Sequence, residues 1–285
     1  MGIIFQTIFK HLSDKEYLNL YWLKKFRSRP DFDNPATFNA KLQWLKLYYH
    51  PAALGTMVDK ATAKDYAAAI IGTEHIIPTF CVADSWSGIH WDALPESFVM
   101  KPTHWGGGRH IVICPDKKAV REEKARRVIT SVMDRNLFDA YREWPFKSIR
   151  PRIIVEQYLG DSLTDYKFFC FGGKAEYIML CVDRFKDKKF FFFDRQWTFC
   201  RFDDYSLTLP PEFTLEKPEN IDAMWEMADK LSQGQPFVRV DLYNTGGKLY
   251  FGEFTFYPCS GFDTTLTPLA ETTLGNMITL PEKTT

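Results

Sequence analysis

A hairpin pattern over residues 237–256 constrains the fold more than any other part of the sequence. Two runs rich in aromatic and β-branched residues flank the turn Asn244–Gly247, which predicts two antiparallel strands. Arg239 and Asp241 are two positions apart, so their side chains lie on one face of the first strand. Pairing across the turn brings Glu253 of the second strand near Asp241. The chain is therefore expected to contain an antiparallel sheet with a charged patch on one face.

This charged patch predicts a metal site. Two carboxylates held close together repel each other unless a cation lies between them. Asp241 and Glu253 therefore predict a hard cation with oxygen ligands, and Mg²⁺ fits that description. Arg239 is expected beside the metal, within reach of an anionic group. On the pattern alone, an exposed strand face with surface ion pairs explains the same residues, and this alternative stays open.

A second feature is a lysine followed by a glycine-rich loop, in the run FVMKPTHWGGGRHIVI. The backbone N–H groups of Gly106, Gly107 and Gly108 can cradle phosphates, and Lys101 adds a positive charge before the loop. The run contains neither a Walker A motif nor a dinucleotide-binding fingerprint. A plain turn between two strands accounts for the loop equally well.

A third feature is an apolar strand that ends in polar residues, in the run RIIVEQYLGDSLTDYKFF. Its end can offer backbone groups to an adenine edge, through Glu156, Gln157, Tyr158 and Leu159. Asp165 is then expected at the ribose hydroxyls. Lys167, on the same strand face as Asp165, is expected at phosphate or substrate. An edge strand with solvated charges is the alternative.

The remaining patterns predict an α+β fold, with helices first and antiparallel sheets after. Helices are predicted at 13–27, 34–49, 59–71, 116–134 and 218–231. Ser13 and Glu16 predict a capping box at the start of the first helix, and the last is expected to face inward with Ile221, Met224, Trp225, Ala228 and Leu231. Strands are predicted at 98–101, 111–114, 153–157, 163–171, 174–182, 189–193, 237–243 and 248–256. Gly172-Gly173 predicts a second hairpin, between 163–171 and 174–182. We divide the chain into a helical region at 1–55, a lobe with the glycine-rich loop at 56–150, and a lobe with the metal-binding strands at 151–285.

Composition excludes several classes of protein. Lys plus Arg and Asp plus Glu number 36 each, so no basic excess indicates a nucleic-acid partner. The six cysteines form no CxxC pair, which argues against a zinc site and for reduced thiols. No apolar run is long enough to span a membrane, and no secretory signal is evident. We therefore expect a cytoplasmic protein.

Taken in order, these segments resemble the ATP-grasp superfamily. The matching residues are Lys60 in VDKATAK, Lys101 before HWGGGR, Glu156 in VEQYL, Arg239-Val240-Asp241 and Glu253-Phe254-Thr255. Within that superfamily the chain most resembles the teichuronopeptide-biosynthesis (TupA-like) group, found among bacterial surface-polysaccharide genes. The phrases that carry this are VDKATAKDYAAAIIGTEHIIPT, LPESFVMKPTHWGGG, IRPRIIVEQYL, DYKFFCFGGKAEYI and FVRVDLYNTGGKLYFGEFTFYPCSG. The resemblance implies two α+β lobes with antiparallel sheets that clasp ATP, preceded here by the helical region.

The resemblance also implies a mechanism. A substrate carboxylate attacks the γ-phosphorus of ATP, and an amine then attacks the acyl phosphate to give an amide. Lys60 and Lys101 hold phosphates, the glycine-rich loop closes as a lid, and Arg239 stabilises the oxyanion. Mg²⁺ is held at Asp241, Glu253 and Thr255. Thr255 stands where many ATP-grasp enzymes have Asn, so a second metal lacks its usual ligand.

The same resemblance implies the substrates. We expect a carboxylate–amine ligase that joins an amino acid to a uronic-acid carboxylate of a capsular or cell-wall polysaccharide. The implied partners are an amino acid, a uronic-acid-containing saccharide or nucleotide sugar, and a glycosyltransferase. Two alternatives remain: a kinase-like phosphotransferase with the same site, and a non-catalytic nucleotide-binding partner of a glycosyltransferase.

Overall fold

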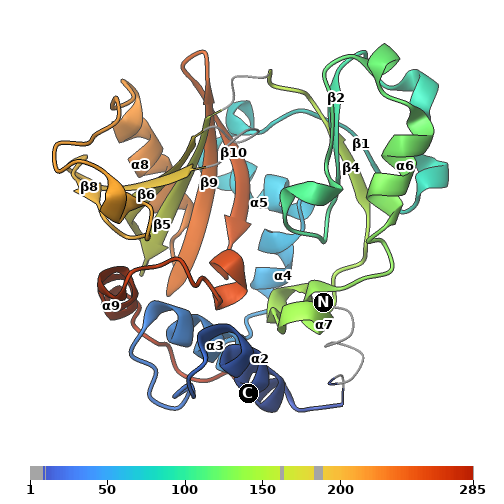
Figure 1. Ribbon diagram of the computed structural model, residues 1–285. Helices are drawn as coiled ribbons and strands as arrows, with labels where there is room; N and C mark the ends of the chain where they lie inside the picture. Colours follow the sequence, from blue (N-terminus) through green and yellow to red (C-terminus); the bar gives the residue numbers. More distant parts are fainter. Residues whose placement is uncertain (1–8, 10, 161–163, 183–188, 285) are drawn as a thin grey trace. The chain divides into compact units, whose positions relative to one another are not determined.

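The computed structural model describes residue 9 and residues 11–160, 164–182 and 189–284 (Figure 1). These residues form two compact units. Unit 1 combines Ile3–Pro51 with Thr164–Thr285, and unit 2 is Ala52–Leu163. Unit 1 is therefore discontinuous in sequence, because the chain leaves it at residue 51 and returns at residue 164. The sequence-based boundaries at residues 55 and 150 stay a prediction.

Unit 1 is built on a six-stranded antiparallel sheet in the order β10-β9-β5-β6-β7-β8. The strands are β5 (Thr164–Phe171), β6 (Lys174–Val182), β7 (Lys189–Asp194), β8 (Phe199–Cys200), β9 (Phe237–Thr245) and β10 (Lys248–Thr255). Gly172 and Gly246 open the tight turns with positive φ, as the two hairpin patterns predict. The sequence missed only β8 in this sheet.

Helix α8 (Ile221–Leu231) covers one face of this sheet. The residues predicted to face inward are all buried: Ile221, Met224, Trp225, Ala228 and Leu231. The Trp225 ring packs edge-on against Phe168 of β5, with ring centroids 4.8 Å apart. This aromatic contact fixes β5, which carries two of the charged residues discussed below.

The other helices of unit 1 are α2 (Asp14–Phe26), α3 (Phe38–Tyr48) and α9 (Pro268–Met277). Ser13 caps α2 in the predicted capping box with Glu16. Helix α3 was predicted to begin at Asn34-Pro35, which is wrong: it begins at Phe38 because Thr37 is its N-cap residue. Helix α9 packs against α3 and had no sequence prediction.

Unit 2 is built on a four-stranded antiparallel sheet in the order β1-β4-β2-β3. The strands are β1 (Thr79–Ala83), β2 (Phe98–Pro102), β3 (Val112–Cys114) and β4 (Ile153–Glu156). The helices are α4 (Ala53–Val58), α5 (Thr62–Ile71), α6 (Glu122–Thr130) and α7 (Leu137–Tyr141). Short 3₁₀ turns in both units are Thr73–His75, Trp86–Gly88, Trp91–Ala93, Gly108–His110, Lys117–Ala119, Trp144–Phe146, Ser206–Thr208 and Pro258–Gly261.

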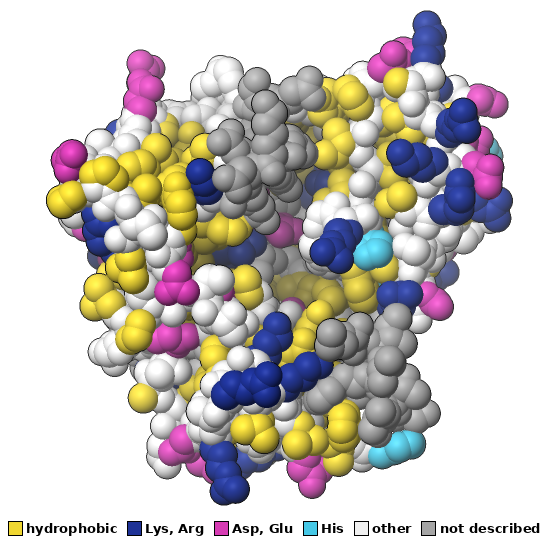
Figure 2. Space-filling view, in the orientation of Figure 1, with side chains coloured by type: hydrophobic (Ala, Val, Ile, Leu, Met, Phe, Trp, Pro, Cys, Tyr) yellow, Lys and Arg dark blue, Asp and Glu magenta, His cyan; other side chains and the backbone are white. Residues whose placement is uncertain are grey.

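Helix α6 covers the apolar face of this sheet. Ala125 and Ile129 of α6 pack with Phe98 and Met100 of β2 in one buried cluster. The opposite side of α6 is exposed, and Figure 2 shows Lys and Arg side chains gathered over it. The long helix predicted from Asp116 to Asp134 is wrong at its start: Asp116 caps only a 3₁₀ turn, and α6 begins at Glu122.

None of the helices in the described part of the chain has the length and apolar character needed to cross a bilayer.

Candidate active site

A row of charged side chains crosses three neighbouring strands of unit 1. In the sheet register, Asp241 of β9 lies opposite Lys167 of β5 on one side and Glu253 of β10 on the other. Residues directly opposite each other in an antiparallel sheet share a face. The three side chains therefore form one row, and Glu253 lies near Asp241 as the hairpin pattern predicted.

A β-bulge at Gly252 creates this alignment. Phe251 pairs with Leu242, but the next pair is Glu253 with Asp241, so Gly252 is the extra residue. Without the bulge, Glu253 would pair with Val240 and point to the other face, because side chains alternate along a strand. A Cβ on Gly252 would lie 2.9 Å from the Asp241 carbonyl oxygen, so the bulge requires glycine.

The Asp241 carboxylate is buried and fully engaged, with a residue exposure of 1%. Its Oδ1 accepts a hydrogen bond from Arg239 Nε at 2.6 Å, and its Oδ2 accepts one from Arg239 Nη2 at 2.8 Å. Lys167 Nζ also donates to Oδ2. Both oxygens of the predicted metal ligand thus contact cationic side chains.

Lys167 and Arg239 each have further partners. Lys167 Nζ lies 2.7 Å from Asp165 Oδ2. Burial opposes the charge of Lys167, but Asp241 and Asp165 outweigh that effect, so its pKa is raised. Arg239 Nη2 donates to Thr255 Oγ1 at 3.0 Å and lies 3.8 Å from Glu253 Oε1. Each of the two cations therefore contacts more than one side chain, and these charge-assisted contacts hold the cluster together.

Glu253 is the most exposed member of the cluster. Its side chain is 37% exposed, whereas those of Lys167 and Arg239 are 12% exposed. Among the described residues, no set of three or more His, Cys, Asp or Glu side chains is arranged to hold a metal ion. Two carboxylates nevertheless suit Mg²⁺ that arrives with phosphate oxygens, because Mg²⁺ commonly uses one or two protein carboxylates. Asp241 and Glu253 fit a metal of that kind.

A second charged cluster lies in unit 2, around Glu156 at the end of β4. Glu156 is 3% exposed. Its Oε1 lies 2.5 Å from Lys64 Nζ and its Oε2 lies 2.7 Å from Lys101 Nζ. Burial raises the pKa of Glu156, but the two lysines outweigh burial and leave it lowered. The side chain therefore holds Lys101 in place as an ionised carboxylate.

Lys64 is the member of this cluster that sequence reasoning missed. It donates to Ile77 O and to Thr79 Oγ1, each at 2.7 Å, and thereby joins α5 to β1. The signal was present in VDKATAK, where Lys64 follows Lys60 by four residues in the helix predicted at 59–71. That helix is wrong at its start: α5 begins at Thr62, so Lys60 lies in the turn before it. Burial lowers the pKa of Lys64 against the opposing pull of Glu156.

The predicted Lys60 lies beside the start of the glycine-rich loop. Its backbone N–H donates to Thr103 O at 3.1 Å. Asp59, the residue before it, accepts from Arg152 Nη2 at 2.9 Å. Thr103 N in turn donates to Arg152 O at 2.8 Å. These bonds fix the backbone from which both Lys60 and the loop depart.

The loop itself is open. A Cβ built on Gly107 or Gly108 would meet nothing within 4 Å, and one on Gly106 would meet only Leu137 Cδ1 at 3.8 Å. His104, before the glycines, is buried and its Nε2 lies 3.0 Å from Val132 O. This anchors one end of the loop and agrees with a structural role for His104.

The predicted adenine-binding segment directly follows Glu156. The Gln157 N–H donates to Pro78 O at 2.9 Å, so this backbone N–H group already has an acceptor within the protein. Tyr158 and Leu159 are half-buried in unit 2. The structure thus brings Glu156 together with Lys101 and Lys64, and separately brings Asp165 and Lys167 together with Arg239, Asp241, Glu253 and Thr255.

A family model described as TupA-like ATPgrasp matches residues 40–279. The chain belongs to the TupA-like ATP-grasp family. The resemblance predicted from the sequence is confirmed. The α+β ATP-grasp fold with a helical N-terminal region is confirmed as well.

Several solved ligases are similar to this TupA-like chain. D-alanine–D-alanine ligase from Bacillus anthracis is 17% identical, with 79% of this chain and 66% of that chain covered and a TM-score of 0.46. The same ligase complexed with ATP is 16% identical, with 71% and 54% covered and a TM-score of 0.40. L-amino acid ligase from Bacillus licheniformis is 15% identical, with 78% and 49% covered and a TM-score of 0.48.

The chain spans about half to two thirds of the length of these ligases. No curated protein matches it.

Proposed function

We propose that this chain is an ATP-dependent carboxylate–amine ligase that forms an amide through an acyl phosphate. Membership of the TupA-like ATP-grasp family supports the nucleotide. The observation that carries the proposal is the row of Lys167, Asp241 and Glu253 with Arg239 beside it. This row combines carboxylates for a metal with a fixed cation for developing negative charge, and phosphoryl transfer needs both.

In unit 2, we assign the triphosphate to Lys60, Lys101 and the backbone N–H groups of Gly106–Gly108. Glu156 orients Lys101 through the 2.7 Å contact between Oε2 and Nζ. The loop has room to close over the phosphates, because a Cβ on Gly107 or Gly108 would meet nothing within 4 Å. A closed loop would exclude water, which otherwise hydrolyses an acyl phosphate.

We assign the binding of the adenosine part of ATP to the segment after β4. Tyr158, Leu159 and the Gln157 carbonyl frame the adenine, since the Gln157 N–H is already used. Asp165 is assigned to the ribose, and Lys167 to phosphate or substrate.

In unit 1, we assign Asp241 and Glu253 as Mg²⁺ ligands, and Thr255 as a third, weaker ligand. Bound there, Mg²⁺ would supply neutralisation of phosphate oxygens during transfer. Arg239 is held by Asp241 and Thr255, so its guanidinium is fixed before any substrate arrives. We assign it to the oxyanion that forms when the amine attacks the acyl phosphate. The reaction needs no nucleophile from the protein.

We propose an amino acid as the amine and a uronic-acid carboxylate of a capsular or cell-wall polysaccharide precursor as the acid. The family membership supports this context. The precursor would be a nucleotide sugar or another saccharide made in the cytoplasm, where ATP is available, and a glycosyltransferase would use the product.

The test is a screen for ADP release, with amino acids paired against UDP-uronic acids and uronic-acid oligosaccharides. The expected hit gives ADP, phosphate and a product whose mass is the sum of both substrates less one water. A product that has gained a phosphoryl group would identify a phosphotransferase instead. Nucleotide binding without ADP release from any pair would favour a non-catalytic partner of a glycosyltransferase.

A further inference from the structure

Each oxygen of the Asp241 carboxylate is already bonded to a cationic side chain. Three N–H donors reach its two oxygens, two from Arg239 and one from Lys167. The carboxylate is 1% exposed, so water does not compete for these contacts. A metal ion that binds Asp241 must therefore compete with the cationic side chains that already contact it.

The charge balance of the cluster leaves only a small net attraction for a free metal ion. Asp165, Asp241 and Glu253 carry three negative charges, and Lys167 and Arg239 carry two positive charges, which leaves a formal charge of −1. A free divalent ion can approach by way of Glu253, the exposed member. It would then meet two buried positive side chains that already neutralise Asp241, and like charges at this range repel strongly.

Of the two cations, Lys167 is the one that can move. Arg239 is held by two bonds to Asp241 and by one to Thr255, in a planar group that must move as a whole. Lys167 has a flexible side chain, and its single ammonium group contacts both Asp241 and Asp165. It can leave Asp241 and still keep Asp165, which lies at 2.7 Å.

We propose that Lys167 acts as a built-in counter-ion that keeps free divalent metal off Asp241, so that metal enters only together with the phosphates of a nucleotide. The phosphates supply the negative charge that offsets the incoming metal, and Lys167 moves away from Asp241. This inference rests on the proposed function, because it assumes a nucleotide ligand. It adds an order of binding: metal and nucleotide bind together, and neither Asp241 nor Glu253 holds the metal beforehand.

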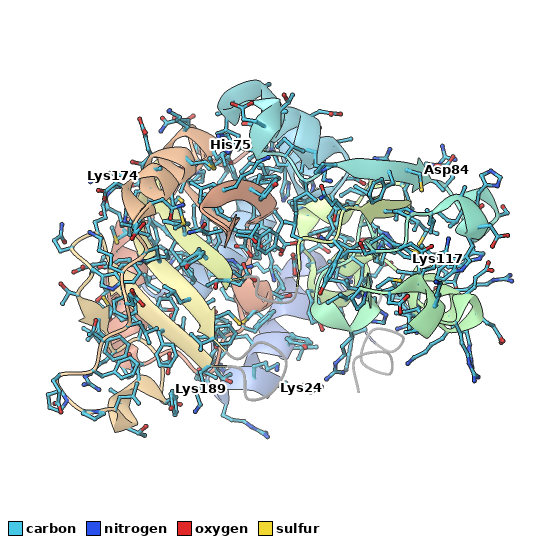
Figure 3. The ribbon with its side chains drawn as sticks, turned by 90° about the horizontal axis from the view of Figure 1, so that it is seen from above. Lys24, His75, Asp84, Lys117, Lys174 and Lys189 are labelled. Atoms are coloured by element: carbon cyan, nitrogen blue, oxygen red, sulfur yellow. The ribbon has the colours of Figure 1, made fainter. Side chains whose placement is uncertain are left out.

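The experiment measures Mn²⁺ binding by electron paramagnetic resonance, in which bound Mn²⁺ loses the signal of the free ion. The full chain is titrated with Mn²⁺ alone and with Mn²⁺ plus a non-hydrolysable ATP analogue, and the Mn²⁺ that the analogue binds without protein is measured separately and subtracted. The variant is Lys167→Met, which keeps the length of the side chain and removes the charge. The matched control is Lys174→Met on β6, whose side chain is 60% exposed and is labelled at the rim of unit 1 in Figure 3.

The wild type and Lys174→Met should bind Mn²⁺ alone weakly and should gain at least about tenfold in affinity with the analogue. Lys167→Met should bind Mn²⁺ alone at least about tenfold more tightly than the wild type, because Asp241 has lost a competing cation. Equal affinities of wild type and Lys167→Met for Mn²⁺ alone would overturn the proposal.

The wild type provides a second measurement in case Lys167→Met does not fold. If the wild type binds Mn²⁺ alone as tightly as it does with the analogue, the proposal is overturned without any variant. That result would leave the proposed function standing, since the nucleotide still binds. Failure of the wild type to bind the analogue, with or without Mn²⁺, would overturn the proposed function and this inference with it.

Discussion

At the scale of single residues, Glu253 is the carboxylate through which the proposed chemistry is tested most simply. It is the exposed member of its cluster, so Glu253→Gln removes a charge without burying a polar group. We expect ADP release with a productive substrate pair to fall by about 100-fold or more, because charge neutralisation at the transferred phosphate is lost. Urea unfolding should stay within about 0.5 kcal/mol of the wild type. Full activity in Glu253→Gln would remove the metal site from the account.

Glu156 gives a prediction about pH. Its pKa is lowered below the ordinary value of 4.5, so the unfolded chain binds its proton more readily than the folded chain. The stabilisation from Glu156 is therefore present above pH 4.5 and is lost as the pH falls through the lowered pKa. We expect Glu156→Gln to be less stable at neutral pH by about 3 kcal/mol, since two buried lysines lose their partner.

The measurement is urea unfolding of both proteins between about pH 3 and pH 7. The stability of Glu156→Gln should decline less on acidification than that of the wild type. Parallel pH curves for the two proteins would show that Glu156 does not contribute in this way.

At the scale of elements, α9 packs so closely on the start of α3 that a methyl group does not fit. A Cβ on Gly275 would lie 2.7 Å from Ala36 O and 2.8 Å from Phe38 N, both backbone atoms. Alanine gains about 1 kcal/mol over glycine in a helix, but overpacking against backbone costs about 1–3 kcal/mol. We expect Gly275→Ala to destabilise the protein by about 1 kcal/mol, as measured by urea unfolding.

Gly55 in α4 is the matched control. Its added Cβ would meet only Pro145 O, at the ordinary distance of 3.6 Å. Gly55→Ala should therefore be neutral or should raise stability by up to about 1 kcal/mol. If both alanine variants changed stability equally, close packing of α9 on α3 would not be the cause.

The strands and helices were predictable where a local pattern decides them. The capping box of α2, the inward residues of α8 and the two glycine turns are local features, and each was confirmed. Helix α9 was missed because its contact with α3 joins residues more than two hundred positions apart. The bulge at Gly252 was missed because a single extra residue leaves the alternating pattern almost unchanged.

The contacts of the candidate site were likewise predictable only where they are local in sequence. That Glu253 lies near Asp241 was predictable from counting across the turn, but their direct pairing was not, because the bulge at Gly252 creates it. The contact of Lys167 with Asp241 was not predictable either, because strand β5 lies far from β9 in sequence and pairs with it only in the sheet. Lys64 was missed for the same reason, since its partner Glu156 lies on a strand that follows much later.

At the scale of the whole molecule, a bound nucleotide should stabilise the folded chain. A ligand at 100 times its Kd stabilises by about 2.7 kcal/mol, which corresponds to a rise in Tm of about 5 °C for a chain of this size. We expect that rise with ATP and Mg²⁺ together in differential scanning calorimetry, and a rise of less than about 1 °C with Mg²⁺ alone. In Lys101→Met the rise with ATP and Mg²⁺ should fall by at least half, which would not occur if Lys101 did not contact the nucleotide.

The central claim is that a substrate carboxylate is activated by phosphoryl transfer from ATP before an amine attacks it. The most direct test supplies the acid substrate with ¹⁸O in its carboxylate and measures the inorganic phosphate by mass spectrometry. An acyl phosphate passes one carboxylate oxygen to phosphate, so we predict that one ¹⁸O appears in the phosphate for each amide formed. Phosphate without ¹⁸O, alongside amide formation, would contradict the account.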